Sequence, residues 1–111
     1  MEQPIMHCPV EITLGIIGGK WKALILWEIR DGPRRFGELK RLVTGISEKM
    51  LIQQLREMEA DGIVHREVYH QVPPKVEYSV TEFGASLNEA LMPLCEWGER
   101  HVERIEAAHR R

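Results

Sequence analysis

The sequence is poor in several features that would mark particular classes of protein. No apolar run approaches the ~18 residues that a membrane-spanning helix needs. The N-terminus has no basic segment followed by an apolar stretch, so we expect no signal peptide. The two cysteines, Cys8 and Cys95, are too far apart to indicate a disulfide framework or a zinc-binding pair. These absences favour a cytoplasmic protein whose thiols are reduced.

Motifs for catalysis are missing as well. The chain has no glycine-rich phosphate loop, no Gly-x-Ser-x-Gly turn and no His-Glu-x-x-His helix. Three histidines that could join Cys8 around a metal, His7, His65 and His70, do not follow a dedicated metal-ligand spacing. We therefore expect no enzymatic activity, no cofactor and no metal centre.

Charge is nearly balanced overall but unevenly distributed. The 15 basic and 17 acidic residues give a formal net charge of −2. Residues 20–75 hold 11 of the basic and 8 of the acidic residues, whereas residues 76–111 hold 4 arginines and 7 glutamates. A basic centre between acidic ends suits a middle segment that faces DNA, although the acidic total favours a protein partner instead.

The most informative stretch is residues 45–62, which predict one helix with clear ends. The Ser47 hydroxyl can accept a hydrogen bond from a free backbone N–H in the first turn, and Gly62 suits a left-handed stop after the last turn. Its buried stripe is expected to consist of Leu51, Leu55 and Met58.

The opposite face of this helix carries Lys49, Gln53 and Arg56, with Ile52 beside them. A cation, an amide and a guanidinium can contact base edges and phosphates in a DNA major groove. Alternatively, the face is simply the solvated side of an amphipathic helix, as on most surface helices.

The remaining pattern predicts further helices followed by two strands. Residues 10–17 favour a helix over a strand, and a brief strand is expected at 34–36. The other predicted elements are helices at 20–30, 36–43 and 82–108, and strands at 63–70 and 75–80. Within them, Leu24 and Leu42 are expected to face the core. A short helix, a glycine turn and a longer helix followed by a β-hairpin form a winged helix-turn-helix.

The last predicted helix, which Thr81 can cap, has a second apolar pattern. Past Thr81 a heptad seam runs through Leu87, Leu91, Leu94, Gly98, His101, Ile105 and Ala108. Pro93 is expected to kink the helix or to start a second segment. Either the seam forms a dimer interface, which we favour, or the helix folds back over the winged domain.

An ordered set of motifs resembles the HxlR-type winged helix-turn-helix transcriptional regulators, which are related to the MarR group. The matching stretches are Cys8-Pro9, Gly19-Lys20-Trp21-Lys22, Arg35-Phe36-Gly37-Glu38-Leu39, residues 45–51, Gln54-Leu55-Arg56, Leu91-Met92-Pro93-Leu94 with Trp97-Gly98, and residues 72–81. The resemblance covers about residues 8–106, nearly the whole chain.

This resemblance implies a homodimer on a palindromic double-stranded DNA operator, with wings along the backbone and contacts through the terminal helices. The fold class is then α+β, mainly α, with a two-stranded hairpin wing and N- and C-terminal dimerisation helices. Residues 1–7 would be a flexible arm, and residues 8–107 the domain that includes the dimerisation helix.

The expected DNA-binding residues are Ser47, Lys49, Gln53, Arg56 and the wing residue Lys75. Further phosphate contacts or merely solvated side chains are Lys20, Lys22, Arg34, Lys40 and His70. Cys95 is expected to pack near the seam.

Several members of the family sense oxidants or electrophiles through an N-terminal cysteine, and Cys8 holds that position. Cys8 is therefore either a thiol sensor or a small buried residue at the dimer interface. A small ligand in the dimer cavity is the other expected effector. The alternative function is a winged-helix protein-interaction module without DNA binding.

Overall fold

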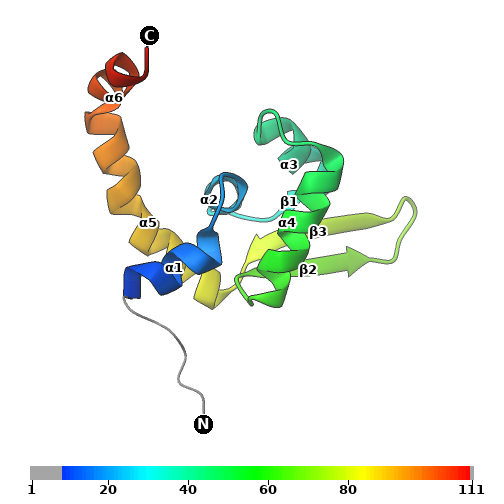
Figure 1. The fold of residues 1–111 in the computed structure, drawn as a ribbon. Coiled ribbons are helices and arrows are strands. Elements are labelled where there is room, and N and C mark those ends of the chain that lie inside the picture. The colour runs from blue at the N-terminus through cyan, green and yellow to red at the C-terminus, as the bar shows by residue number, and fades with distance from the viewer. Residues whose placement is uncertain (1–8, 111) are drawn as a thin grey trace.

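The fold was obtained as a computed structural model in which residues 9–110 are described. The helices are α1 (Pro9–Ile17), α2 (Trp21–Glu28), α3 (Phe36–Leu42), α4 (Glu48–Ala60), α5 (Glu82–Arg100) and α6 (Val102–His109), and the strands are β1 (Arg34–Arg35), β2 (Val64–Tyr69) and β3 (Lys75–Val80) (Figure 1). The predicted arm and Cys8 lie outside the described residues. The mainly helical winged helix-turn-helix fold is confirmed.

Helix α4 begins and ends where its sequence predicts. The Ser47 side chain accepts a hydrogen bond from the Met50 N–H at 3.0 Å. At the other end Gly62 has a φ of +79°, which residues with a side chain rarely adopt. The predicted stripe is buried, with Leu51, Leu55 and Met58 all exposed by 2% or less. Local chemistry at both ends thus fixes the second helix of the helix-turn-helix.

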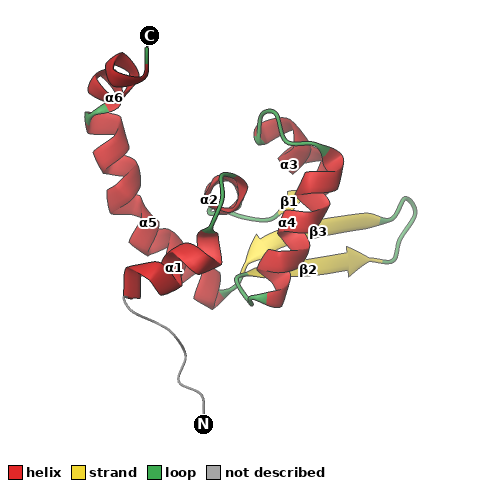
Figure 2. Ribbon diagram, in the orientation of Figure 1, coloured by secondary structure: helices red, strands yellow, loops and turns green. Residues whose placement is uncertain are grey.

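The wing is a hairpin that belongs to a three-stranded antiparallel sheet in the order β1-β3-β2 (Figure 2). Arg34 and Arg35 pair with Tyr78 and Glu77, which confirms the expected brief strand. The three apolar positions of β3 at alternate residues are buried or packed against the core: Val76, Tyr78 and Val80. Alternation along β3 therefore seats the wing on the helices.

One core joins α2, α3, α4 and the start of the wing. Its fully buried side chains are Ile25, Leu26, Ile29, Leu39, Ile46, Leu51, Leu55, Met58 and Ile63. The expectation that Leu24 and Leu42 face this core is wrong, because they are 44% and 38% exposed. The core face of α2 centres on Ile25 and Ile29, so Leu24 is turned away. After α3 ends, Val43 enters the core in place of Leu42.

The final helical segment is interrupted, but not at the expected residue. Pro93 lies within a continuous α5, and the break falls at His101, whose φ and ψ are −119° and 14°. Proline removes a single backbone donor, and the exposed turn at Pro93 tolerates that loss. Gly98, a poor helix former, precedes the break, and its carbonyl accepts the His101 N–H at 3.2 Å.

Helices α5 and α6 extend away from the winged body, on the side opposite the wing hairpin (Figure 1). The start of the seam packs against the core, where Leu87 is partly buried and Leu91 is 9% exposed. Beyond it Leu94 is 64% exposed, and Trp97 and Val102, which flank the seam, are about half exposed. None of the helices in residues 9–110 is both long enough and apolar enough to span a membrane.

Candidate nucleic-acid interface

The outer side of α4 carries the residues predicted to contact DNA. Lys49, Gln53 and Arg56 are exposed and share a shallow concave surface with Ile52 and two glutamates. We call this surface, lined by Glu48, Lys49, Ile52, Gln53, Arg56 and Glu57, the reading face. Ser47 caps the same helix, so four of the five predicted DNA-binding residues are brought together on α4.

The acidic residue Glu57 forms an ion pair with a buried lysine. Its Oε1 lies 2.7 Å from the Lys22 ammonium, and its Oε2 accepts a hydrogen bond from Gln53 Nε2 at 3.3 Å. The hydrogen bond from Lys22 is the main cause that lowers the pKa of Glu57, followed by the one from Gln53. The Glu57 charge is therefore matched by a buried cation, which leaves Lys49 and Arg56 against the single carboxylate of Glu48 on the reading face.

This pairing corrects the interpretation of Lys22 as a phosphate contact. Lys22 on α2 is only 8% exposed, and its ammonium is engaged by Glu57. An ammonium this buried needs a carboxylate partner, and the long stem of lysine lets it reach across the core. Lys22 thus acts as a support for α4, whereas Lys20 and Lys40 are exposed.

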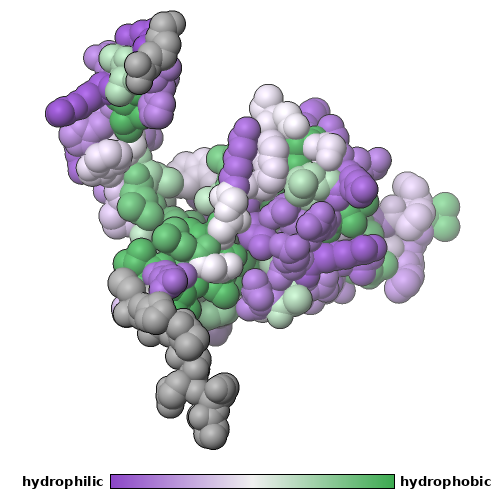
Figure 3. Space-filling view, viewed as in Figure 1, coloured by the Kyte–Doolittle hydropathy of each residue, from purple (hydrophilic) through white to green (hydrophobic). Residues whose placement is uncertain are grey.

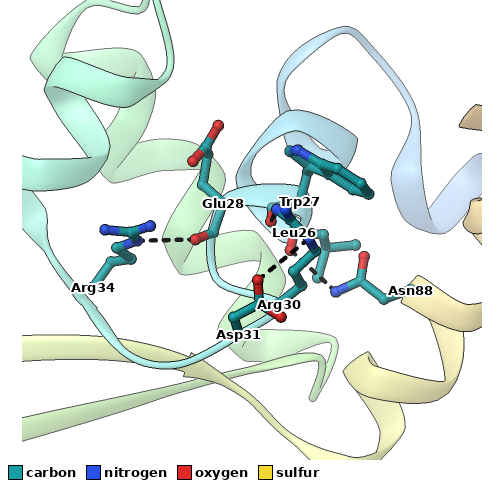
Figure 4. Close-up of polar contacts among 7 residues, drawn as sticks. All are labelled: Leu26, Trp27, Glu28, Arg30, Asp31, Arg34 and Asn88. Atoms are coloured by element: carbon teal, nitrogen blue, oxygen red, sulfur yellow. Dashed lines mark hydrogen bonds and ion pairs between the residues drawn. The ribbon is translucent and has the colours of Figure 1, made fainter. Parts of the chain in front are cut away.

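A second predicted phosphate contact, Arg34, is also occupied within the protein. Its Nε donates to the Glu28 carbonyl at 3.1 Å, at the end of α2 (Figure 4). Two more side chains donate to neighbouring carbonyls: Arg30 to Trp27 at 2.6 Å and Asn88 to Leu26 at 3.0 Å. The free carbonyls of this helix end are satisfied by side chains, which link α2 to β1 and α5.

The wing places Lys75 apart from the reading face. Its ammonium lies 3.6 Å from Glu77 Oε2 and 4.4 Å from the ring centroid of Tyr69. The Glu77 charge is the main cause that raises the pKa of Tyr69. Lys75 is thus partly neutralised by its neighbours on the wing. His70 and the tip residue Val72 are exposed.

A residue that the sequence reasoning missed is Arg66. It pairs with Tyr78 across the hairpin, on the same side of β2 as Val64 and Val68. Arg66 is exposed and lines a groove between α4 and the wing. The alternation Val-x-Arg-x-Val in β2 was the available signal, because it places a cation in an apolar row.

The structure describes only one of the two cysteines. Cys8 lies outside the described residues, so its proposed sensing role remains a prediction. Cys95 is exposed on α5 in the single chain, so its expected packing near the seam stays a prediction for the dimer. The seam beside it turns away from the winged body at this point, so no other element of the described chain covers it.

These features define a winged helix-turn-helix protein whose second helix, α4, exposes side chains suited to DNA. Comparison with known proteins gives the family. A family model described as HxlR-like helix-turn-helix matches residues 16–106. The HTH-type transcriptional regulator YybR of Bacillus subtilis (strain 168) is 56% identical over 100 residues, which cover 90% of this chain and 80% of YybR.

A second relative, the HTH-type transcriptional regulator YdeP of the same organism, is 54% identical and covers 89% of this chain and 77% of YdeP. Among solved structures, the redox regulator HypR in its reduced form superposes with a TM-score of 0.85 at 55% identity, over 90% of this chain and 99% of HypR. The chain therefore belongs to the HxlR-like helix-turn-helix family. It is a helix-turn-helix transcriptional regulator.

Proposed function

We propose that this regulator binds a palindromic DNA operator as a homodimer, with α4 of each protomer in one of two successive major grooves. The observation that carries this proposal is the reading face, where exposed Lys49, Gln53 and Arg56 stand on the second helix of a helix-turn-helix. A dimer with such helices requires half-sites about 34 Å apart, one turn of DNA.

Each of the five candidate DNA-binding residues has a specific proposed role. Gln53 suits adenine and Arg56 suits guanine, because both can form paired hydrogen bonds with those base edges. Lys49 and the N-terminal turn capped by Ser47 contact phosphates, which favour the positive end of a helix. Lys75 contacts the backbone beside the wing after exchanging Glu77 for a phosphate.

The homodimer is supported by apolar surface that the single chain leaves uncovered. On α1, Val10, Ile12 and Leu14 are 44–63% exposed, and Leu94 and Trp97 on α5 are more than half exposed. Figure 3 shows hydrophobic atoms gathered around α1, whereas hydrophilic atoms cover the region of α4. Exposed apolar surface of this kind marks an interface, so we propose that both terminal helices contact a second copy.

We further propose that a thiol oxidant or electrophile acts on Cys8 and alters the spacing of the two recognition helices. Support comes from HypR, a 55% identical protein whose structure is described as that of a redox regulator in its reduced form. A small ligand bound between the protomers is the alternative effector. Because a DNA-binding regulator must reach its operator, we propose a cytoplasmic location. The arm at residues 1–7 and the domain at 8–107 remain our proposed boundaries.

The test is selection from a pool of random DNA duplexes, followed by sequencing, with and without a thiol oxidant. An enriched palindrome with half-sites one turn apart is the expected result. Its loss on oxidation should persist in a Cys95→Ser variant and disappear in Cys8→Ser. If the folded dimer selects no sequence at low salt, DNA binding is refuted, and a protein-interaction module becomes the better explanation.

A further inference from the structure

Three polar side chains are linked in series from the protein interior to the reading face. Lys22 on α2 is the buried inner end of this series. Glu57 lies in the middle, and its two oxygens have different partners: Oε1 lies 2.7 Å from the Lys22 ammonium, whereas Oε2 accepts from Gln53 Nε2 at 3.3 Å. Gln53 is the outer end, on the reading face. We call these three residues the polar series.

The inner end of the polar series has a fixed direction. Lys22 reaches Glu57 because α2 packs against α4, and an ammonium has donors but no acceptor. Glu57 meets it as a charged carboxylate, since the contacts with Lys22 and then with Gln53 lower the pKa of Glu57. A carboxylate has acceptors but no donor. Both hydrogen bonds of the series therefore run from a nitrogen to a Glu57 oxygen.

This direction allows one orientation of the Gln53 amide. A free amide can turn about its last bond and exchange the places of its oxygen and its NH2 group. The turned form would set Gln53 Oε1 against Glu57 Oε2, which are two acceptors with no proton between them. Nε2 therefore lies toward Glu57, and Oε1 is left for an incoming base. The Nε2 hydrogen on the same side as Oε1 is left for that base as well.

A base that meets this amide must place a donor opposite Gln53 Oε1. Adenine does so with its N6 amino group, while its N7 accepts the remaining Nε2 hydrogen. Guanine offers the same N7, but it has the acceptor O6 where adenine has N6. Guanine would therefore set O6 against Oε1, so the orientation of this one amide separates the two purines.

We infer that Lys22 and Glu57 are positioning residues that set the base preference of α4, because they hold the Gln53 amide with its oxygen outward and so make it select adenine over guanine. This inference rests on the proposed function, in which Gln53 contacts a base edge. Lys22 thereby acts on sequence readout from inside the protein, without touching DNA itself.

The most informative variant is Glu57→Gln, which keeps the shape of the side chain but has one oxygen and one NH2 group in place of two oxygens. Lys22 can only donate, so it takes the oxygen of the new amide and leaves the NH2 group facing Gln53. Gln53 must then turn its own oxygen inward and its Nε2 outward. Its outward hydrogens suit O6 of guanine, so the preference should reverse from adenine to guanine.

The measurement begins with selection from random duplexes by the wild type and by Gln53→Ala. The base pair that Gln53 reads is the one whose preference the alanine variant loses. Affinities are then compared for the selected operator and for a duplex with guanine in place of adenine at that pair. We expect the wild type to favour adenine by about fivefold or more, as for a good base contact, and Glu57→Gln to favour guanine by a similar factor.

Two further variants make this test specific. Glu48→Gln removes a carboxylate from the same reading face, but it lies five residues before Gln53, a spacing at which helix side chains do not pair. It should strengthen binding to both duplexes and keep the adenine preference. Lys22→Met/Glu57→Gln removes both charges, so no charge is left buried alone. Without the inner donor, this double variant should lose the preference rather than reverse it.

Several results would refute the inference. An adenine preference that survives in Glu57→Gln, or a reversal that Glu48→Gln shows equally, would mean that Glu57 does not orient the Gln53 amide. Loss of the preference in Glu57→Gln without reversal would overturn the part assigned to Lys22. If Glu57→Gln does not fold, the double variant decides, because an adenine preference retained there excludes the polar series as its cause.

The outcomes also separate this inference from the proposed function. If the wild type selects an operator and Gln53→Ala selects the same one, DNA binding stands and this inference alone fails. A wild-type preference for a G·C pair at the position read by Gln53 has the same meaning. If the folded wild type selects no sequence at low salt, the proposed function fails together with this inference.

Discussion

Replacing Gly84 with alanine should destabilise the protein, because α5 approaches the backbone of Ile63 at this residue. A methyl group at position 84 would meet the Ile63 carbonyl oxygen first, and it would lie 3.0 Å from the carbonyl carbon and 3.2 Å from Cα. The same oxygen accepts the Thr81 N–H at 3.2 Å. Thr81 also donates its hydroxyl to the Gly62 carbonyl at 2.6 Å. This joint fixes the direction in which α5 leaves the winged body.

The expected loss of stability follows from three contributions. Forcing an extra methyl group into packed structure costs about 1–3 kcal/mol, and displacing the Ile63 carbonyl weakens a backbone hydrogen bond worth about 0.5–1.5 kcal/mol. The helical preference of alanine over glycine offsets about 0.5–1 kcal/mol. We therefore expect Gly84→Ala to lower the free energy of unfolding by about 1–3 kcal/mol, or the Tm by about 4–12 °C.

Circular dichroism of thermal and urea unfolding at one fixed protein concentration provides the measurement. The matched control is Gly37→Ala on α3, where an added methyl group meets no atom within 4 Å and should stabilise slightly. If Gly84→Ala is as stable as the wild type or gains stability like the control, α5 does not pack against Ile63 as described.

Three other predictions follow from the same structure. Contacts with Lys22 and Gln53 lower the pKa of Glu57 below its ordinary value of 4.5. The stability that the ionised Glu57 carboxylate adds is therefore present above about pH 4.5 and disappears as the pH falls through the lowered pKa. The urea midpoints of wild type and Glu57→Gln should converge from pH 6 to pH 3, and a constant difference would refute this. Ser47→Ala should lower the free energy of unfolding by about 1 kcal/mol and Ser47→Gly by a few tenths, as urea titrations would measure; equal losses would argue against the cap. Leu94→Glu on the α5 seam should shift the sedimentation profile from dimer to monomer, while Val72→Glu on the wing leaves it unchanged. A Leu94→Glu dimer of normal affinity would exclude the seam as the dimer interface.

Much of the recognition unit could be predicted from the sequence, because its determinants are close together in the chain. The Ser47 hydroxyl and Gly62 define the ends of α4 by local hydrogen bonding and backbone conformation. The repeat of leucines and a methionine on α4 predicted its buried stripe correctly. The alternation of residues 75–80 likewise predicted the inner side of β3.

Helix boundaries near weak signals were less predictable. Pro93 was the obvious candidate for a break, yet α5 continues through it and ends at His101. Proline removes the N–H that would donate to the carbonyl four residues earlier, but Pro93 is exposed and the helix continues through it. The exposed fractions of Leu24 and Leu42 depend on how neighbouring elements pack. Periodicity distinguishes the apolar side of a helix from its polar side, but it does not show how much of the apolar side the core covers.

The sequence by itself determined the order of the elements, the recognition helix and the positions of its outward side chains, since these depend on residues three or four apart. Only the tertiary structure decided what the cations do. Lys22 and Arg34 are engaged within the protein, whereas Arg66 lines the groove between α4 and the wing and forms no ion pair within residues 9–110. The physical reason is that the environment of a charge is set by elements distant in sequence: Lys22 meets Glu57 only because α2 packs against α4, and Arg66 meets the groove only because the hairpin folds beside the recognition helix.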